Sequence, residues 1–296
     1  MTQQPPTHIR IGHSPDPDDA FMFWALAKDK IDTGDLTFEH VLRDIETLNR
    51  WALEGRLEIT ALSLHAYPYV QDKYTLLPHG ASMGDGYGPI VVSRVGEAPA
   101  DLTAARIAIP GEMTTAFLTL NLYAGRLTNY VVVPFDEIPA YVREGKADAG
   151  LLIHEGQLTY REDGLELVVD LGVWWQELTG GMPLPLGVNA VRRDLGHDLQ
   201  VQLSELLGAS IDLGLERRDE ALEYALQFGR GLDTELADRF VGMYVNDLTR
   251  DYGIRGRAAI EELLRRTEAA GLFADPLVDL PPVDRVQVSW LVPVEA

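Results

Sequence analysis

The stretch HIRIGHSPDPDDAFMFWALAKDK, residues 8–30, determines the fold class. Its opening, HIRIGHSP, is a short run with apolar and β-branched residues, which predicts a strand over His8–Pro15. After the turn residues, Asp18 opens an apolar run that predicts a helix over Asp18–Lys30. A strand followed at once by a helix is the unit from which parallel α/β sheets are built. The sequence therefore predicts an α/β protein.

The same alternation continues outward from this unit. The next expected elements are strands over 36–42, 58–63 and 88–94 and a helix over 44–55. The small, polar, proline-containing segment Val95–Ala105 then predicts a domain boundary. A second α/β set is expected after it, with strands over 106–110, 130–135, 149–154 and 165–172 and helices over 114–125 and 137–146. Two α/β lobes in one chain predict a ligand cleft between them.

The last third of the sequence, from Asp194, predicts nearly continuous helix. In Arg257–Ala270 the spacing i, i+3, i+4, i+7 predicts one buried face. The residues of that face are Ile260, Leu263, Leu264 and Thr267. The segment Asp233–Val245 is also capped and amphipathic. The proline-rich tail after residue 275 is expected to lie along the surface as a strap.

Composition excludes several classes of function. The chain has 296 residues, of which 46% are hydrophobic and 24% charged, as in a globular protein of two domains. Its net charge of −21 argues against nucleic-acid and anionic-membrane partners, because phosphates need clustered Lys and Arg. No apolar run reaches the roughly 18 residues that a membrane span needs. The opening MTQQPPTHIR lacks a secretory pattern, and cysteines are absent, so we expect a cytoplasmic protein.

An anionic ligand of so acidic a chain needs donors supplied by the site itself. The segment IPGEMTTAFLTL, residues 109–120, ends a strand at Pro-Gly and opens a helix with Thr114 and Thr115. Two interpretations stand here. One threonine simply caps the helix, or the exposed N–H groups and the helix dipole form a receptor for a carboxylate or phosphate.

Other segments carry weaker signals. Ala61, Leu62 and Ser63 end a predicted strand, and ligands in open α/β sheets bind beyond the carboxyl ends of strands. Ser63 has no evident His–Asp pair, so its expected role is binding. The glycine-rich segment 80–89 precedes a strand and has no lysine, which excludes a phosphate loop. It is expected to be a flexible loop beside the sheet, or a segment that closes over a ligand.

His154 is the most informative of seven scattered histidines, whose spacing argues against a metal site. It ends the predicted strand 149–154 at the carboxyl edge, facing the expected cleft. A lone histidine is more often a hydrogen-bonded core residue. The alternative is a general base, since the ordinary pKa of imidazole suits proton transfer at neutral pH.

A resemblance bears on that choice. Seven stretches occur in this order: SPDPDDAFMFWAL, DIETLNRWALEGRLEITALS, GYGPIVVSR, PGEMTTAFLTLNLY, AGLLIHEGQLTY, VVDLGVWWQELTGGMPLPLG and YVNDLTRDYG. Together they closely resemble the 1,4-dihydroxy-6-naphthoate synthase family of the futalosine route to menaquinone. The likeness runs from about Ile9 to about Tyr252. The combination of ETLNRWALEG, the IHE motif and the segment from DLG to LPLG is specific.

The resemblance implies a two-lobed periplasmic-binding-protein type II fold, with two crossover strands and a ligand cleft between the lobes. Residues 1–95 and 190–296 would form the larger, discontinuous lobe, and residues 96–189 the smaller inserted one. It also implies a cofactor-free carbon–carbon lyase that converts cyclic dehypoxanthinyl futalosine, a small-molecule carboxylate, to 1,4-dihydroxy-6-naphthoate. The implied proton acceptor is His154. The implied substrate contacts are Ala61, Leu62, Ser63, Thr115 and Ala116.

The chain departs from the family in its first motif, which is commonly SPCPNDTF and here reads SPDPDDAF. Asp16 and Asp18 stand at variable places, so the resemblance assigns this loop no ligand role. For His13, beside it, a structural role is favoured. Trp174 and Trp175 either wall the substrate ring or, as paired aromatics after a strand more often do, pack the lobe.

Two other functions compete with the lyase. A solute-binding protein for a small carboxylate shares the implied fold, because one fold hosts many functions. Such a protein predicts a signal peptide or lipid anchor. The second rival is a sister enzyme of the same fold and pathway, a dehydratase that acts on chorismate. It should lack the IHE motif and the segment from DLG to LPLG.

Overall fold

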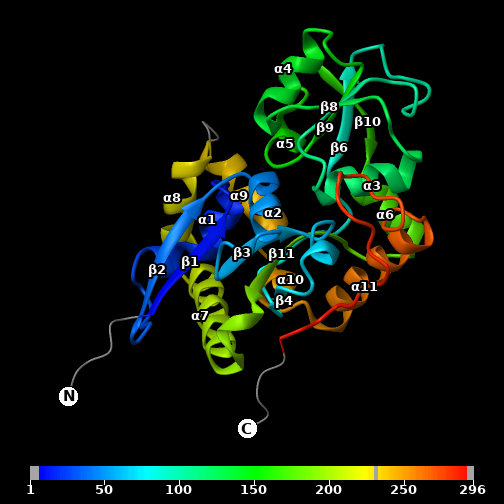
Figure 1. Ribbon diagram of the computed structural model, residues 1–296. Helices are drawn as coiled ribbons and strands as arrows, with labels where there is room; N and C mark the ends of the chain where they lie inside the picture. Colours follow the sequence, from blue (N-terminus) through cyan, green and yellow to red (C-terminus); the bar gives the residue numbers. More distant parts are fainter. Residues whose placement is uncertain (1–6, 230–232, 292–296) are drawn as a thin grey trace, which may run out of the picture.

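The chain folds into two β-sheets with helices around them (Figure 1). The structure is a computed structural model that describes residues 7–229 and 233–291. The beginning and the last third of the chain surround the first sheet, and the middle of the chain forms the second (Figure 1). The predicted α/β class is confirmed.

The first sheet is six-stranded, with the order β2-β1-β3-β11-β4 and β5 paired to β11. Its strands are β1 (Thr7–His13), β2 (Leu36–Leu42), β3 (Ile59–Ser63), β4 (Tyr74–Leu76), β5 (Ser82–Gly84) and β11 (Leu184–Arg192). β1 runs parallel to β2 and β3, whereas β11 runs antiparallel to β3. The carboxyl ends of β1 and β3 therefore meet at one edge, where α/β proteins bind ligands.

The second sheet is five-stranded, with the order β10-β6-β9-β7-β8. Its strands are β6 (Ile90–Arg94), β7 (Ile107–Ile109), β8 (Tyr130–Val132), β9 (Ala149–Leu152) and β10 (Leu165–Asp170). β7 is parallel to β8 and β9, and β6 is antiparallel to β9 and β10. The carboxyl ends of β7 and β9 thus also share one edge, which leads into α3 and into the IHE motif.

Helices cover both sheets. They are α1 (Pro17–Ala27), α2 (Ile45–Ala52), α3 (Thr115–Ala124), α4 (Ile138–Arg143), α5 (Gly156–Thr159), α6 (Leu171–Thr179), α7 (His197–Glu216), α8 (Arg218–Ala225), α9 (Thr234–Tyr244), α10 (Asp247–Arg250) and α11 (Gly253–Ala269). α1 packs against α7, α8 and α9, as Figure 1 shows. The predicted face of α11 is confirmed, because Ile260, Leu263, Leu264 and Thr267 are all buried.

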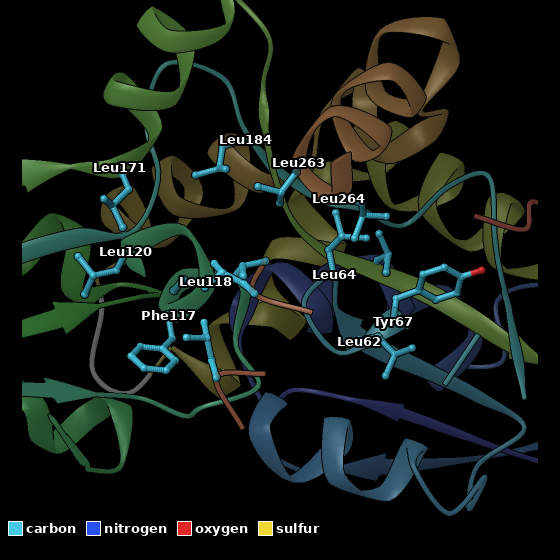
Figure 2. Packing of buried hydrophobic residues seen from close by; sticks show 14 of the residues in the cluster. Leu62, Leu64, Tyr67, Phe117, Leu118, Leu120, Leu171, Leu184, Leu263 and Leu264 are labelled. Atoms are coloured by element: carbon cyan, nitrogen blue, oxygen red, sulfur yellow. The ribbon is translucent and has the colours of Figure 1, made fainter. Parts of the chain in front are cut away.

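One apolar cluster joins the two sheets. It combines Leu62 and Leu64, at the end of β3, with Ile107 of the second sheet. Helix α3 lies within this cluster, with Phe117, Leu118 and Leu120 all buried. Figure 2 labels these three residues of α3 together with Leu263 and Leu264 of α11, which belong to the same cluster. The two lobes therefore share a core, in addition to the segments that connect them.

The structure differs from the predicted elements in several places. The expected strand 165–172 ends at Asp170, whose carboxylate accepts hydrogen bonds from Gly172 N and Val173 N and so caps α6. The bulky residues of α6 resemble a strand in sequence, which hid this helix. The strand β11 was also missed, because Pro185 interrupts its pattern, and its pairing with β5 shifts register at that point.

One strand near the predicted lobe boundary lies in the second sheet. Residues 95–105 were predicted to link the lobes, yet β6, just before them, already belongs to the second sheet. The polar segment is a surface loop within the second lobe (Figure 1). The exact bounds of the lobes stay a prediction. We propose that the chain crosses at 85–89 and again at 180–183, in both cases before the predicted limits of 95 and 190.

The tail is a strap, as the sequence predicts. Leu76 N donates to Ser289 O, and Leu291 N donates to Leu76 O, so residues 289–291 extend the first sheet beside β4. Over the ranges 7–229 and 233–291, no helix is both long and apolar enough to cross a membrane.

Candidate active site

A cavity lies where the carboxyl ends of β1, β3, β7 and β9 approach one another. It contains about 700 Å³ of open space, part of it continuous with solvent. The lining residues come from both lobes: Ser14, Asp18, Asp19, Ile45, Ala61, Leu62, Ser63, Gly80, Ser82, Pro89, Thr114, Thr115, Ala116, Ile153, His154, Gln157, Leu186, Gly187, Val188, Phe240 and Tyr244. All six residues that the sequence marked for a site, Ala61, Leu62, Ser63, Thr115, Ala116 and His154, are among them.

His154 lies in the turn after β9. The predicted strand 149–154 ends at Leu152, so His154 follows the strand and does not close it. Its backbone has φ of 55°, in the left-handed region that few non-glycine residues adopt. Such a conformation costs about 1–3 kcal/mol and persists only where the surroundings enforce it. The ring packs edge-on against Phe135, with the centroids 4.7 Å apart.

A buried carboxylate faces this imidazole. His154 Nε2 lies 3.3 Å from Asp16 Oδ2, and the two side chains are 17% and 1% exposed. Asp16 belongs to the other lobe, where it is the N-cap residue of α1. The contact therefore crosses the cavity's edge and ties the IHE turn to the SPDPDD loop. A carboxylate at this distance stabilises the charged imidazolium.

The loop after β1 brings two more carboxyl groups to the cavity wall. Asp19 Oδ2 accepts hydrogen bonds from Ser14 N and Ser14 Oγ, at 2.7 and 2.8 Å. Burial raises the pKa of Asp19 to about 6, against the opposing effect of the Ser14 hydrogen bonds. Burial, with the Asp19 and Asp16 carboxylates close by, raises the pKa of Asp18 well above its ordinary value. The sequence analysis gave this loop no role, although its place after a parallel strand was a usable signal.

The start of α3 offers backbone donors to the cavity. The hydroxyl of Thr114 caps the helix, accepting from Phe117 N and donating to Gly111 O. The hydroxyl of Thr115 donates to Leu186 O at 2.5 Å and accepts from His65 N. Both hydroxyls therefore donate within the protein, which leaves the backbone N–H groups as the donors for a ligand. Within the described part of the chain, the N–H groups of Thr115 and Ala116 have no recorded acceptor, as in any first helical turn.

The position of Ser63, at the end of β3, is fixed by hydrogen bonds to Asn49. The fully buried Asn49 of α2 donates to Ser63 Oγ and accepts from Ser63 N, at 3.0 and 2.8 Å. Asn49 also donates to Met113 O, in the loop that leads into α3. This one amide therefore sets the Ser63 hydroxyl relative to the α3 start in the opposite lobe. The Glu46 side chain packs against the backbone there, because a Cβ on Gly111 would lie 2.5 Å from a Glu46 carboxylate oxygen.

The remaining wall comes from α9 and α5, which the sequence did not indicate. Tyr244 OH donates to Gln157 Oε1 at 2.9 Å, and both residues are buried. Phe240 lies one turn before Tyr244 on α9. Nothing in an amphipathic pattern separates an aromatic that lines a cavity from one that fills a core, so no sequence signal could have found these residues.

The positions of Trp174, Trp175 and His13 indicate structural roles for all three residues. Trp175 is fully buried with its Nε1 bonded to Pro183 O, and Trp174 stacks edge-on against Tyr123, so both pack the lobe. His13 lies outside the cavity, stacked on Phe23, and burial lowers its pKa to about 3. Its structural role is confirmed.

The glycine-rich segment 80–89 is not simply a flexible loop. Residues 82–84 form β5, and Gly80 N is bonded to Thr249 O. Gly80, Ser82 and Pro89 line the cavity, so this segment forms part of its wall. Among the residues that the structure describes, no group of His, Asp and Glu has the arrangement of a metal site.

These features define a class: a two-lobed α/β protein of the periplasmic-binding-protein type, with a partly buried cavity between the lobes that is mostly apolar and carries a few polar groups. Known structures agree. A solved protein from Archaeoglobus fulgidus is 49% identical, with a TM-score of 0.85, 90% of this chain covered and 98% of that one. The alkanesulfonate-binding protein SsuA from Xanthomonas axonopodis shares the fold at a TM-score of 0.68 and 14% identity, covering 95% and 97% of the two chains.

Sequence comparison identifies the family. Residues 9–269 match the model of a family described as menaquinone biosynthesis, and the chain belongs to this family. A relative in Thermus thermophilus, named 1,4-dihydroxy-6-naphthoate synthase, is 44% identical over 90% of this chain and 96% of its own length. A relative of the same name in Streptomyces coelicolor is 39% identical over 89% and 94%. The recognised resemblance is thus confirmed.

Proposed function

We propose that this chain is a lyase of menaquinone biosynthesis that forms 1,4-dihydroxy-6-naphthoate from cyclic dehypoxanthinyl futalosine. The observation that carries the proposal is His154, partly buried at the cavity wall beside the Asp16 carboxylate. The names of the two relatives, at 44% and 39% identity, support the product. A mostly apolar cavity with a few polar groups, shared by two lobes, suits a small molecule that must be held away from water.

In this proposal His154 is the general base. It removes a proton from a carbon next to a carbonyl group of the substrate, and the electron pair forms an enolate. Loss of the sugar-derived fragment then leaves an aromatic ring, whose stability drives the reaction. A positioned base contributes about 10²- to 10⁴-fold to such a rate. Orientation of the substrate and stabilisation of the enolate oxygen supply the rest.

Asp16 would assist the base in two ways. Its Oδ2 faces Nε2 of His154, which favours the tautomer with the proton on Nε2 and leaves the Nδ1 lone pair to accept the substrate proton. Once the imidazolium has formed, the same carboxylate stabilises its charge, as in other His–Asp pairs. Asp16 therefore acts through His154 and is a positioning residue.

The carboxylate of the ligand is proposed to bind at the start of α3. The N–H groups of Thr115 and Ala116 are directed outward from the helix end, where the helix dipole is positive. Local donors matter because the protein carries a net charge of −21. Ala61, Leu62 and Ser63 would complete this side of the site, with Ser63 held by Asn49. We also propose a cytoplasmic location, which suits a chain without cysteines.

The test is conversion of the substrate by the purified protein. Incubation with cyclic dehypoxanthinyl futalosine, without added cofactor, should produce 1,4-dihydroxy-6-naphthoate, seen by its fluorescence and mass. Binding of the substrate without any conversion would support a solute-binding protein instead. Conversion of chorismate would identify a dehydratase. Either result would overturn the proposal.

A further inference from the structure

A buried carboxyl group with one unpartnered oxygen forms part of the cavity wall. Asp18, in the first turn of α1, is only 6% exposed, and it lines the cavity. Its Oδ1 is sealed from solvent and has no hydrogen-bond partner within residues 7–229 and 233–291. Buried polar atoms in native proteins nearly always have a partner, so an exception calls for an explanation. A ligand in the cavity is the partner that this position offers.

Its neighbours show which end of the cavity Asp18 occupies. Asp16, two residues before it, lies 3.3 Å from His154, the proposed base. Asp19, the next residue, is already bonded to Ser14. The charged or titratable groups around Asp18 are therefore Asp16 and Asp19 on its own loop, His154 from the second lobe and Tyr244 from α9. None of these supplies a positive partner within contact distance of Asp18 itself.

We propose that the Asp18 carboxyl donates a hydrogen bond to a hydroxyl or keto oxygen on the ring of the bound ligand. The proposal rests on the proposed function, and it adds a donor at the reacting end of the site, away from the α3 start. A neutral carboxyl group has one O–H to give, and a carboxylate has none. Burial and two neighbouring carboxylates raise the pKa of Asp18, which favours the neutral form that can donate.

The donor would serve the reaction directly. Enolate formation places negative charge on a ring oxygen, and a hydrogen bond aimed at that oxygen stabilises the charge as it develops. A buried neutral donor does this without adding a third full negative charge beside Asp16 and Asp19. Asp18 would therefore be a catalytic residue, because its O–H contacts the oxygen that gains charge.

Two variants and two ligands separate this role from a structural one. The ligands are 1,4-dihydroxy-6-naphthoate and 2-naphthoate, which has the carboxylate but no ring hydroxyl groups. Asp18→Ala should weaken binding of the dihydroxy compound about tenfold and that of 2-naphthoate less than about twofold. Asp18→Asn keeps a donor of the same shape, so it should bind both ligands nearly as native. Asp35→Asn, at an exposed position outside the cavity, is the matched control for charge.

Three results would overturn the inference. Equal losses for both ligands in Asp18→Ala would indicate a general distortion of the site. A loss in Asp18→Asn as large as that in Asp18→Ala would show that Asp18 accepts and does not donate. Full affinity of Asp18→Ala for the dihydroxy compound would exclude any contact. Circular dichroism checks the fold of each variant. Failure of the proposed function looks different, because the native protein would then form no product from the substrate.

Discussion

His154 occupies a position that few side chains tolerate. Its left-handed backbone turns the chain immediately after β9, and the ring then meets Asp16 from the other lobe. A glycine would adopt this backbone more easily, so the histidine is retained at a cost of about 1–3 kcal/mol. We infer that the side chain, and not the turn, is the reason for this residue.

The raised pKa of Asp18 predicts how the stability of the protein changes with pH in the absence of a ligand. Its pKa is raised in the folded protein, whereas an unfolded aspartate titrates near pH 4. Below about pH 4 the Asp18 carboxyl is protonated in both the folded and the unfolded state, so it does not change the free energy of unfolding. As the pH rises, the unfolded chain releases this proton first, and the native protein loses stability. Asp18→Asn cannot ionise, so its stability relative to native should increase from about pH 4 to pH 7.

Urea unfolding of both proteins at several pH values measures this difference. Titrating groups away from Asp16, Asp18 and Asp19 cancel, because they are common to the two proteins. Asp35→Asn again serves as the control for charge. A difference that stays constant with pH, or that reverses sign, would contradict a raised pKa for Asp18.

Some residues of the site can be recognised from the sequence, and others cannot. Ser63, Thr115 and His154 follow strands or open a helix, and such positions can be recognised in a sequence. Tyr244 and Gln157 lie far apart in the chain and meet only because α9 packs beside the second lobe. No local pattern contains that information, so only the structure shows that α9 forms part of the cavity wall.

At the scale of elements, the start of α3 is fixed by its contact with β11. Thr115 Oγ1 donates to Leu186 O and accepts from His65 N, so this one hydroxyl ties the helix to two other segments. The sequence predicts α3 within one residue at each end. It could not predict β11, because the strand that anchors α3 returns antiparallel and carries Pro185.

Thr115→Val tests this anchor. Valine has nearly the shape of threonine, but it leaves the Leu186 carbonyl and the His65 N–H without their partner. The affinity for 1,4-dihydroxy-6-naphthoate should fall about five- to tenfold, with a smaller effect on kcat. Thr119→Val, on the same helix and bonded only to the Thr115 carbonyl, is the matched control. Unchanged product affinity in Thr115→Val would count against an anion site at the start of α3.

At the scale of the whole molecule, the shared core joins the lobes more firmly than their connecting segments alone would. Leu62, Phe117 and Leu263 belong to one buried cluster, although they come from different lobes and from the helical third of the chain. Sequence periodicity identifies each buried face separately. It does not say that the faces meet, so the shared core could not be predicted from the sequence.

We therefore expect the two lobes to unfold together. Calorimetry should show one transition in which the calorimetric and van't Hoff enthalpies agree. Saturating 1,4-dihydroxy-6-naphthoate should raise the midpoint of that transition without splitting it, because a ligand that binds only the native state stabilises it by mass action. Two separable transitions would show that the shared cluster contributes little.

The central claim is that His154 is the base that starts the reaction, and His154→Asn tests it most directly. The measurement is kcat for conversion of cyclic dehypoxanthinyl futalosine, with the Kd of 1,4-dihydroxy-6-naphthoate determined on the same protein. We predict that kcat falls at least about 10²-fold while the product Kd stays within about threefold, because the base is lost and the binding groups remain. His197→Asn, at the exposed start of α7, should retain native kcat. A His154→Asn protein with nearly native kcat would contradict the account.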